Sequence, residues 1–445
     1  MENLIKSVRD KRVTIIGAGI SGKAASELAY YLGAKVILTD DNKKKEILKD
    51  NNKIKYCFGY YPDESLNSEL VIVSPGIDCN KNIFIKKIKQ KKIPIVSEIE
   101  FASWFTNSKT IAITGSNGKS TVVKILGEVF KLKFPNTMIG GNIGIPYSSN
   151  VLNELKNKLK HVIHILEISS YQLEKVYFFK PEISCILNIA KDHLERYGSY
   201  KDYYQTKFKI YNENKLFYNG EDEILKKRFS KAKYTTPFST KNDKEYNVNK
   251  KRIFNKLNND HIDLSKINLL GNHNIENIFA VLYISSEMNV EFEFVKKIIY
   301  NFKSLEHRIE KINTKPLIIN DSKSTNLHSC KAAVNSFDEN MTLILGGYSN
   351  EKVEKDEIIN IVNKKTIKRI ICYGEIGGTI YEIIKNYKKS KYINNFKEAI
   401  FESLDKLSKN EILLFSPGFK SFDQFINFEE RGIAFRKNIE EYFKK

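Results

Sequence analysis

The segment from Thr110 to Thr121 reads TIAITGSNGKST and has the residue types and spacing needed for phosphate chemistry. An apolar strand is predicted to end at Gly115, and a helix over Val122–Phe130 is predicted to follow Lys119. The backbone N–H groups of such a turn, together with the helix N-terminus, form a cradle for phosphate oxygens. Lys119 would neutralise phosphate charge, and the hydroxyl group that follows it would bind Mg²⁺.

The spacing of this loop is GxxGKS rather than the usual GxxxxGKS, so a simpler interpretation competes with the phosphate site. In that interpretation Gly118 only supplies a left-handed turn between a strand and a helix. Because the strand, the glycines, the Lys-Ser-Thr triplet and the helix coincide, we favour a nucleotide site. The residues expected to bind the nucleotide are Gly115, Ser116, Asn117, Gly118, Lys119, Ser120 and Thr121.

Three more residues follow strands predicted for the same sheet. Glu167 ends the apolar run 161–166, His193 follows the run 185–189, and Lys207 lies further along the chain. Each alone has an ordinary explanation, as a helix-cap partner, a hydrogen-bonded loop residue or a solvated cation. The carboxyl ends of parallel strands meet at one edge of a sheet, so we expect these residues to share an Mg²⁺ site. The expected metal residues are Ser120, Glu167, His193 and Lys207.

A second glycine-rich turn, Gly17-Ala-Gly19-Ile-Ser-Gly22, occurs near the N-terminus, and Asp40 follows at the end of the next predicted strand. This matches the dinucleotide fingerprint and, taken alone, favours a dehydrogenase. The tight turn Ser74-Pro75-Gly76 would lie at the same edge. The fingerprint indicates only that a pyrophosphate group would fit there, and any conjugate of a nucleoside diphosphate carries one.

These motifs must be positioned by strands that alternate with helix-length segments, the pattern of parallel α/β sheets. Three blocks result, with boundaries near residues 97 and 302. The strands expected in the first block are Arg12–Ile16, Lys35–Thr39, Tyr56–Phe58, Leu70–Ser74 and Pro94–Val96. Those expected in the second are Thr110–Thr114, Val162–Glu167 and Cys185–Ile189, before short strands and loops over Asn219–Asn268 and a helix after Gly271. Those expected in the third are Leu317–Asn320, Thr342–Leu345, Arg369–Tyr373 and Ile412–Phe415.

Composition excludes several classes of protein. Of the 445 residues, 41% are hydrophobic and 28% are charged, which excludes disordered and collagen-like chains. No uncharged apolar run approaches the roughly 20 residues that span a bilayer, and no secretory signal is visible. The five scattered cysteines fit a reducing compartment, so we expect a cytoplasmic protein without membrane contacts. The net charge of +20 comes mostly from scattered lysines, which favours anionic small-molecule substrates over nucleic acid.

Several further motifs run in one order through nearly the whole chain. Besides the phosphate loop they are GGNIG at 140–144, EISSYQLE at 167–174, DHLERY at 192–197, GNHN at 271–274, HR at 307–308, NDSKSTN at 320–326, SFDQF at 421–425 and FEERG at 428–432. On these residues the sequence resembles the Mur ligases. The DSKxTN element points to the branch of that family that adds D-glutamate.

The resemblance implies an ATP-dependent amide ligase with three α/β domains. These would be a Rossmann-like substrate-binding domain over residues 1–97, a central P-loop-type ATPase domain over 98–302 and a Rossmann-like, glutamate-binding domain over 303–445. Such an enzyme adds D-glutamate to UDP-N-acetylmuramoyl-L-alanine through an acyl phosphate made with ATP and Mg²⁺, in peptidoglycan synthesis. Its substrates are small molecules, and we expect a monomer.

The resemblance also implies roles for individual positions. Those implied to bind the UDP-bearing substrate are Ile20, Ser21, Asp40, Ser74, Gly76, Asn142 and His193. Those implied to bind ATP, beyond the phosphate loop, are Asn274, Asn277, Arg308 and Asp321. Those implied to bind D-glutamate are Lys323, Thr325, Ser421 and Phe428. The catalytic residues would be Lys119, Lys207 and His193.

In the Mur ligases, a lysine at the position of Lys207 carries a carbamate derived from CO₂, which turns a cation into an anionic oxygen ligand for Mg²⁺. An ordinary lysine, with a pKa of about 10.4, has little free amine to react. We therefore expect burial or nearby positive charge to lower the pKa of Lys207.

The chain departs from well-known members of the family at the glutamate site. It has Asn350 in the segment Tyr348-Ser-Asn350, where those members carry a lysine, and Lys420 where a small residue is common. Lys420 either supplies the missing cation or is a solvated lysine on a loop. The KM for glutamate of a Lys420→Ala variant would distinguish the two.

Other functions remain open at this point. A folylpolyglutamate synthetase belongs to the same superfamily, but the DSKxTN and SFDQF motifs count against it. A nicotinamide-dependent oxidoreductase would use the turn at 17–22, and a non-catalytic nucleotide-binding regulator would not need the Mg²⁺ ligands. Whether D- or L-glutamate is preferred is left open by the sequence.

Overall fold

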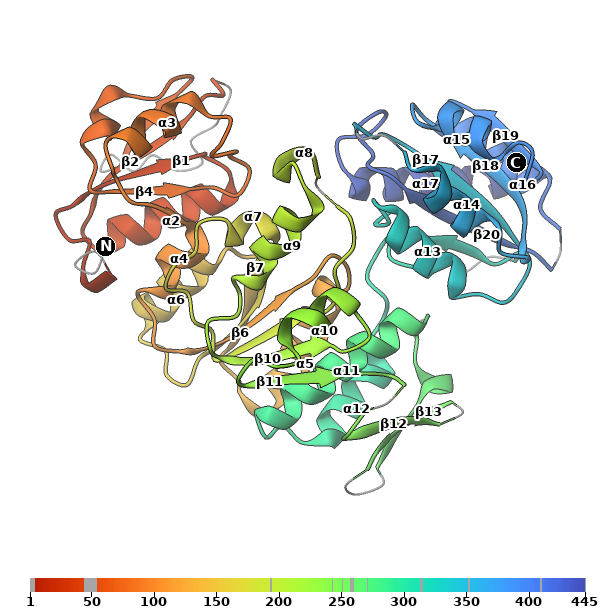
Figure 1. The fold of residues 1–445 in the computed structure, drawn as a ribbon, viewed down its shortest axis with the longest axis horizontal. Helices are drawn as coiled ribbons and strands as arrows, with labels where there is room; N and C mark the ends of the chain where they lie inside the picture. Colours follow the sequence, from red (N-terminus) through yellow and green to blue (C-terminus); the bar gives the residue numbers. More distant parts are fainter. Residues whose placement is uncertain are drawn as a thin grey trace.

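The computed structural model describes residues 5–43, 54–192, 194–241, 243–249, 251–256, 260–269, 271–312, 315–350, 353–408 and 410–444. Three large sheets follow one another along the chain and are flanked by helices (Figure 1). The first and third sheets lie on opposite sides of the molecule, and the middle sheet connects them. The expected α/β class is therefore confirmed.

The first sheet is fully parallel, with the strand order β3-β2-β1-β4-β5. Its central strands are short runs of Val, Ile and Leu that are buried on both faces, as parallel strands covered by helices require. Helix α3 begins where the Asn82 side chain accepts a hydrogen bond from Ile85 N. The elements are β1 (Arg12–Ile16), α2 (Ile20–Tyr31), β2 (Lys35–Asp40), β3 (Ile54–Phe58), β4 (Leu70–Val73), α3 (Ile83–Gln90) and β5 (Ile95–Ser97).

The middle sheet is also parallel and has the order β11-β10-β9-β6-β8-β7, with the strand of the phosphate loop, β6, near its centre. Its strands are β6 (Lys109–Thr114), β7 (Thr137–Gly141), β8 (Ile163–Glu167), β9 (Ile183–Ile186), β10 (Lys215–Asn219) and β11 (Thr235–Phe238). Its helices are α4 (Glu98–Ser103), α5 (Lys119–Lys133), α6 (Tyr147–Asn157), α7 (Ser170–Leu173), α8 (Leu194–Tyr197), α9 (Tyr200–Phe208), α10 (Glu223–Phe229), α11 (Asn272–Glu287) and α12 (Phe292–Asn301).

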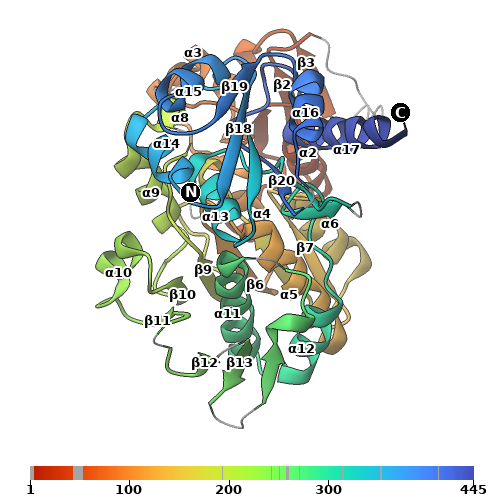
Figure 2. The ribbon, with the colours of Figure 1, turned by 90° about the vertical axis from the view of Figure 1, so that its right-hand side faces the viewer.

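Two hydrophobic clusters cover the two faces of the middle sheet. On one face, apolar residues of α5, α11 and α12 pack against the strands. On the other face, the cluster continues into the first sheet, because α2 packs against α6 and α4. A small antiparallel ribbon extends away from the rest of the molecule (Figure 2). Its strands are β12 (Tyr246–Asn249), β13 (Arg252–Asn255) and β14 (His261–Asp263).

The third sheet has the order β15-β16-β20-β17-β18-β19, and only β15 runs antiparallel to its neighbour. It has its own hydrophobic clusters on both faces. Its strands are β15 (Glu310–Ile312), β16 (Ile318–Asn320), β17 (Met341–Gly346), β18 (Ile367–Tyr373), β19 (Ser390–Ile393) and β20 (Ile412–Gly418). Its helices are α13 (Leu327–Asn335), α14 (Lys355–Val362), α15 (Gly377–Ile384), α16 (Phe396–Asp405) and α17 (Phe428–Lys444).

Every strand expected from the sequence is present within about two residues at each end, with two exceptions. The strand expected over Cys185–Ile189 ends three residues early at Ile186, and the strand expected over Ile412–Phe415 continues three residues further, to Gly418. Strands β7, β10, β15 and β19 were not expected, and helix α10 lies in the stretch assigned to short strands and loops. Among the described helices, none is both long enough and apolar enough to cross a bilayer.

Candidate active site

The phosphate loop connects the end of β6 to the start of α5 and is fastened to the loop that follows β9. Ser116 N donates to Asn188 O at 2.9 Å, and Asn117 N donates to Asn188 Oδ1 at 2.8 Å. Gly118, which precedes α5, has a φ of +90°, and a Cβ there would lie 2.3 Å from Asn277 Oδ1. The loop therefore needs glycine at this position both for its backbone conformation and for its close approach to α11.

Lys119 is the first residue of α5 and folds back over the loop. Its Nζ donates to Gly115 O at 2.8 Å and to Ser116 O at 2.9 Å. Burial lowers the pKa of Lys119, while the nearby carboxylates of Glu167 and Asp192 raise it. These hydrogen bonds hold the ammonium group against the phosphate loop, close to where a bound phosphate would lie.

Glu167 ends β8 beside the loop and has one carboxylate oxygen with no protein partner. Its Oε1 accepts a hydrogen bond from Asn142 Nδ2 at 2.9 Å. Its Oε2 is buried and has no hydrogen-bond partner within the described part of the chain. A buried carboxylate oxygen left without a donor is costly unless a cation binds it, so this oxygen fits a hard cation such as Mg²⁺.

Of the other residues expected to bind the metal, the structure describes Ser120 but not His193. Ser120 is buried in the first turn of α5, next to the loop. His193, expected both as a metal ligand and at the UDP-bearing substrate, lies outside the described residues. The described residues contain no group of three or more His, Cys, Asp or Glu side chains arranged around a common metal position. A cation here would depend on Glu167, on the Ser120 hydroxyl and on oxygens from a substrate.

Lys207 is almost completely buried on α9, and its Nζ donates to Gly115 O at 3.1 Å. It also lies 4.8 Å from the centre of the Tyr203 ring. Burial, and then the positive charge of Lys119, lower its pKa well below the usual value, although Asp192 and Glu167 act in the opposite direction. The pKa of Lys207 is therefore lowered, as expected, and the causes are burial and a nearby positive charge.

A cavity of about 480 Å³ extends from the phosphate loop toward the third sheet. Asn117 and Gly118 of the loop line it together with Asn277, Arg308 and Asp321, so five of the eleven residues expected at the nucleotide line one cavity. Asn274 lies behind this wall, where its Oδ1 accepts a hydrogen bond from Asn277 Nδ2 at 3.1 Å.

Arg308 connects the third sheet directly to the phosphate-loop helix, because its Nη1 donates to Thr121 Oγ1 at 2.9 Å. Asp321 lies nearby and is fully enclosed. Its carboxylate accepts from Ser416 Oγ at 2.7 Å and from Ile309 N at 3.1 Å. Burial raises the pKa of Asp321 to about 7, against the opposite effect of these hydrogen bonds.

Sequence reasoning missed several residues of this cavity. Burial raises the pKa of Glu276 to about 7, and burial lowers the pKa of His273 to about 4. Both line the cavity, as does Asn188, whose amide binds the loop. Asn188 follows the apolar run of β9, and this is the signal that would have indicated it. Glu276 and His273 lie within an expected helix, where spacing alone gives no such signal.

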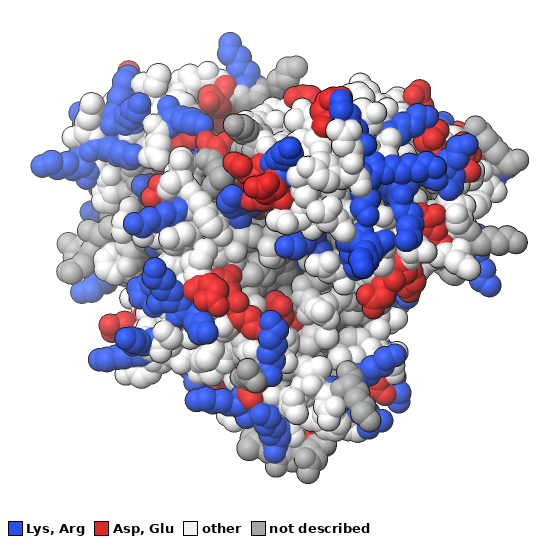
Figure 3. Space-filling model, turned by 45° about the vertical axis from the view of Figure 1, so that its right-hand side comes forward, with Lys and Arg blue, Asp and Glu red and all other residues white. Residues whose placement is uncertain are grey.

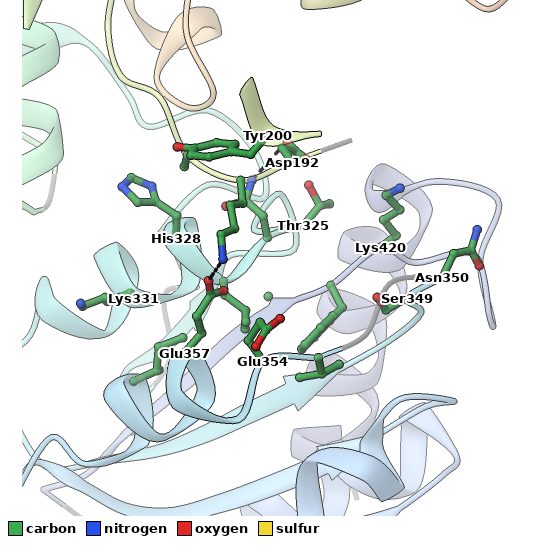
Figure 4. Close-up of a pocket in the computed structure, with 18 of the residues that line it drawn as sticks. Asp192, Tyr200, Thr325, His328, Lys331, Ser349, Asn350, Glu354, Glu357 and Lys420 are labelled. Carbon is green, nitrogen blue, oxygen red and sulfur yellow. Dashed lines mark hydrogen bonds and ion pairs between the residues drawn. The ribbon is translucent and has the colours of Figure 1, made fainter. Parts of the chain in front are cut away.

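A second cavity, of about 680 Å³, lies between the loops of the middle sheet and those of the third sheet (Figure 4). Of the residues expected at D-glutamate, only Thr325 lines it. Lys323 lines the first cavity instead, with its Nζ 3.6 Å above the Phe428 ring. Ser421 is buried, and neither it nor Phe428 is among the lining residues of either cavity. The four expected residues therefore do not surround one common cavity.

The described residues expected at the UDP-bearing substrate gather at the carboxyl edge of the first sheet, apart from Asn142. Ser74 Oγ donates to Gly17 O, and Asp40 Oδ2 accepts from Ala18 N, both at 2.7 Å. These two side chains therefore hold the glycine-rich turn in shape. Ile20 is 75% exposed on that edge, with Ser21 and Gly76 close by in the same turns.

The charges on the surface agree with the composition. Lys and Arg side chains spread over the visible face in Figure 3, with Asp and Glu between them rather than as a separate acidic region. A protein of net charge +20 with such a distribution attracts anions over a broad area.

Taken together, the fold and the site define a class: an α/β nucleotide-binding protein whose phosphate loop faces a second α/β unit across the first cavity. The comparisons with known proteins specify the family. The model of the Mur ligase middle domain matches residues 113–285, and that of the MurD-like N-terminal domain matches residues 11–97. The chain belongs to the Mur ligase family, as the sequence motifs predicted.

Individual relatives are similar over their full lengths. The UDP-N-acetylmuramoylalanine--D-glutamate ligase of Buchnera aphidicola subsp. Schizaphis graminum is 36% identical, covering 96% of this chain and 97% of the relative. The ligase of the same name from Thermoanaerobacter sp. (strain X514) is 32% identical, covering 98% and 99%. Among solved structures, MurF ligase from Thermotoga maritima in complex with ADP has a TM-score of 0.62 at 17% identity, covering 99% of this chain and 96% of that one.

Proposed function

We propose that the protein is an ATP-dependent ligase that joins D-glutamate to UDP-N-acetylmuramoyl-L-alanine. The observation that carries the proposal is the set of charged groups gathered at the phosphate loop. Lys119 covers the loop, Glu167 presents an oxygen without a protein partner, and Arg308 reaches in from the third sheet. The relatives named as ligases of this reaction, at over 30% identity and nearly full length, support the same substrates.

The reaction has two steps. An oxygen of the alanyl carboxylate attacks the γ-phosphorus of ATP, which forms an acyl phosphate and releases ADP. The free amine of D-glutamate then attacks the carbonyl carbon, and the tetrahedral intermediate expels phosphate with loss of one proton from nitrogen. The product is an amide, and the phosphate retains one oxygen that came from the carboxylate.

The main physical obstacle to the first step is that an anion must attack another anion. Arg308 lines the first cavity and Lys119 lies on the phosphate loop beside it, so both place positive charge near the position that the transferring phosphoryl group would take. Fixed charges in a partly dry site stabilise the developing negative charge more strongly than the same charges in water. The loop N–H groups and the α5 N-terminus add to this field.

Glu167 and Ser120 are the described residues that would hold Mg²⁺, with His193 as a further ligand. Bound Mg²⁺ would reduce the repulsion between the phosphate oxygens and the attacking carboxylate. A carbamate on Lys207 would add an anionic oxygen to this ligand set. The lowered pKa of Lys207 supports this modification, because the uncharged amine is the form that reacts with CO₂.

We assign one substrate to each part of the chain. Residues 1–97 would bind the UDP-bearing substrate at the turns that contain Gly17 and Ser74, with Asn142 contributing from the middle part. Residues 98–302 would bind ATP, and residues 303–445 would bring D-glutamate to the second cavity through Thr325. Asn274, Asn277 and Asp321 would contact ATP. Lys323, Ser421 and Phe428 would also contribute to binding D-glutamate, although none of them lines the second cavity. We further propose that the protein acts as a monomer in the cytoplasm, in peptidoglycan synthesis, without nucleic acid.

The test is the dependence of phosphate release on each substrate. We expect release only when UDP-N-acetylmuramoyl-L-alanine, D-glutamate, ATP and Mg²⁺ are all present, and loss of release in Lys119→Ala. Lys124, exposed on the same helix, provides the control, since Lys124→Ala should keep full activity. Release without the UDP-bearing substrate, or undiminished release by Lys119→Ala, would contradict the proposal. L-glutamate in place of D-glutamate tests the enantiomer.

A further inference from the structure

The second cavity has three lysines in its walls, and their surroundings differ. Lys191 donates to Glu357 Oε1 at 2.8 Å, and its side chain is half exposed. Lys331 lies at the end shared with the first cavity. Lys420 lies at the opposite end, with Ser349 and Asn350 (Figure 4), and its side chain is only 23% exposed. Because Tyr348, Ser349 and Asn350 are uncharged, Lys420 is the cation of this end among the residues that the structure describes.

The backbone of Lys420 is fixed from three sides. Tyr348 N donates to Lys420 O at 2.8 Å, and Lys420 N donates back to Tyr348 O at 3.2 Å. The fully buried Arg431 donates to the same carbonyl at 3.2 Å. A Cβ on Gly347 would lie 2.4 Å from it, so the neighbouring loop must have glycine there to approach so closely. A lysine on such a rigid base loses little additional freedom when it binds an anion.

The partner of Lys420 is a carboxylate from another part of the chain. Its Nζ lies 2.6 Å from Glu195 Oε1, on the short helix α8 of the middle part. That helix is held in turn by Arg196, whose guanidinium donates to Pro75 O and Ile77 O, each at 2.9 Å. Glu195 therefore presents a side-chain carboxylate to Lys420 from an anchored position inside the cavity wall.

We propose that Lys420 binds the side-chain carboxylate of the amino-acid substrate and that Glu195 is the internal carboxylate with which that substrate competes. A glutamate side chain ends in the same group, and Lys420 can pair closely with one carboxylate at a time in this geometry. The inference rests on the proposed function and specifies how its acceptor amino acid is selected. It assigns to Lys420 a binding role, and to Glu195 a role in setting the affinity.

The experiment compares KM values for D-glutamate across three variants. In Lys420→Met, which keeps the length of the side chain and removes its charge, we expect a KM for D-glutamate raised about 10-fold, the effect of losing a hydrogen bond to a charged group. The KM values for ATP and for the UDP-bearing substrate should stay within about twofold. Preference for D-glutamate over D-glutamine should fall by a similar factor, and Lys420→Arg should restore most of it. In Glu195→Gln the KM for D-glutamate should decrease, because the competing charge is gone.

Lys191→Met is the matched control, because Lys191 and Glu357 form an ion pair between the same two parts of the chain at the same cavity. If Lys420 only ties those parts together, Lys191→Met and Lys420→Met will change all three KM values alike, and the inference is wrong. An unchanged KM for D-glutamate in Lys420→Met also overturns it. Wild-type protein that releases no phosphate with any substrate would instead refute the proposed function, and this inference with it.

Discussion

Two lysines, the buried Lys207 and the half-buried Lys119, share one acceptor at the centre of the site. Lys119 and Lys207 both donate to the carbonyl oxygen of Gly115, at 2.8 and 3.1 Å. Two ammonium groups that close together repel one another strongly in a region from which water is excluded. Burial, and then the charge of Lys119, lower the pKa of Lys207 well below its usual value. Burial also lowers the pKa of Lys119, and the carboxylates of Glu167 and Asp192 act in the opposite direction on both lysines. A negative group on Lys207 would convert this repulsion into attraction.

This arrangement predicts the behaviour of two Lys207 variants. Lys207→Arg keeps the positive charge and cannot form a carbamate, so we expect ligase activity to fall by about 100-fold or more. Lys207→Ala should be similarly inactive, but added short carboxylic acids such as acetate should restore part of its activity, because they supply the missing anionic oxygen. The measurement is phosphate release with and without acetate. Near-normal turnover by Lys207→Arg would rule out the carbamate.

At the scale of single elements, helix α4 carries two buried glutamates in opposite situations. Glu98 accepts one hydrogen bond, from Ser148 N at 2.5 Å, and its Oε2 has no partner among the described residues. Glu100 accepts from the indole of Trp104 and from the backbone N–H groups of Tyr177, Phe178 and Phe179. Burial raises the pKa of Glu98 to about 7. The charged form of Glu98 therefore destabilises the folded protein, whereas the carboxylate of Glu100 has its hydrogen bonds satisfied.

The pKa of Glu98 makes stability depend on pH. Because the pKa of Glu98 is raised in the folded state, the folded protein keeps a proton on Glu98 between about pH 4.5 and 7, where the unfolded chain has lost it. The free energy of unfolding therefore falls as the pH rises over this range, and the loss is complete once the pH has passed 7. We expect Glu98→Gln to raise the free energy of unfolding at pH 8 by up to about 3 kcal/mol and to change it little at pH 4.5. Urea denaturation at the two pH values measures this.

Glu100→Gln, two residues further along α4, is the control. The amide of the introduced glutamine would place its own N–H donors against the N–H donors that now bind the Glu100 carboxylate. The substitution should therefore destabilise the protein by about 2 kcal/mol at both pH values. If Glu98→Gln destabilises the protein at pH 8, burial is not the dominant effect on Glu98.

Three of the four strands that sequence reasoning missed share a physical cause. Strands β15 and β19 lie at the edges of their sheet and have few buried positions, so they carry little apolar pattern. Strand β7 is an edge strand that ends in two glycines. Their pairing depends on partners that are distant in sequence. Helix α10 did have a local signal, since the Asp222 side chain caps it and Glu223 begins its first turn.

The phosphate loop and its neighbours were predictable because local chemistry determines them. The same reasoning indicated Glu167, which ends a strand of the same sheet. The two cavities were not predictable in this way, because their walls come from loops far apart in the chain. The pairing of Lys420 with Glu195 joins residues 225 positions apart, and no spacing rule reaches across that distance.

At the scale of the whole molecule, side-chain contacts cross from the middle part to the third sheet around the cavities. Arg308 contacts Thr121, and Asn117 contacts the His328 ring at 3.1 Å. Lys191 and Lys420 form ion pairs in the same region. These contacts join the middle part to the third sheet around two cavities whose walls carry both basic and acidic side chains.

The net charge of +20 predicts that association with substrate depends on salt. Raising the ionic strength from about 0.02 to 0.3 M shortens the distance over which charges act from about 20 to 6 Å. We expect kcat/KM for ATP to fall several-fold over this range, because the field that attracts the anion is screened. Inhibition by uncharged adenosine, which feels no such field, should change by less than twofold and serves as the control. A salt-independent kcat/KM for ATP would contradict the prediction.

The central claim, that the alanyl carboxylate is activated by direct attack on ATP, is tested most directly by oxygen transfer. UDP-N-acetylmuramoyl-L-alanine labelled with ¹⁸O in both carboxylate oxygens is incubated with the enzyme, D-glutamate, ATP and Mg²⁺, and the released phosphate is analysed by mass spectrometry. The acyl phosphate route predicts one ¹⁸O atom in each phosphate, because the bridging oxygen leaves with phosphorus. Unlabelled phosphate, released together with amide product, would contradict it.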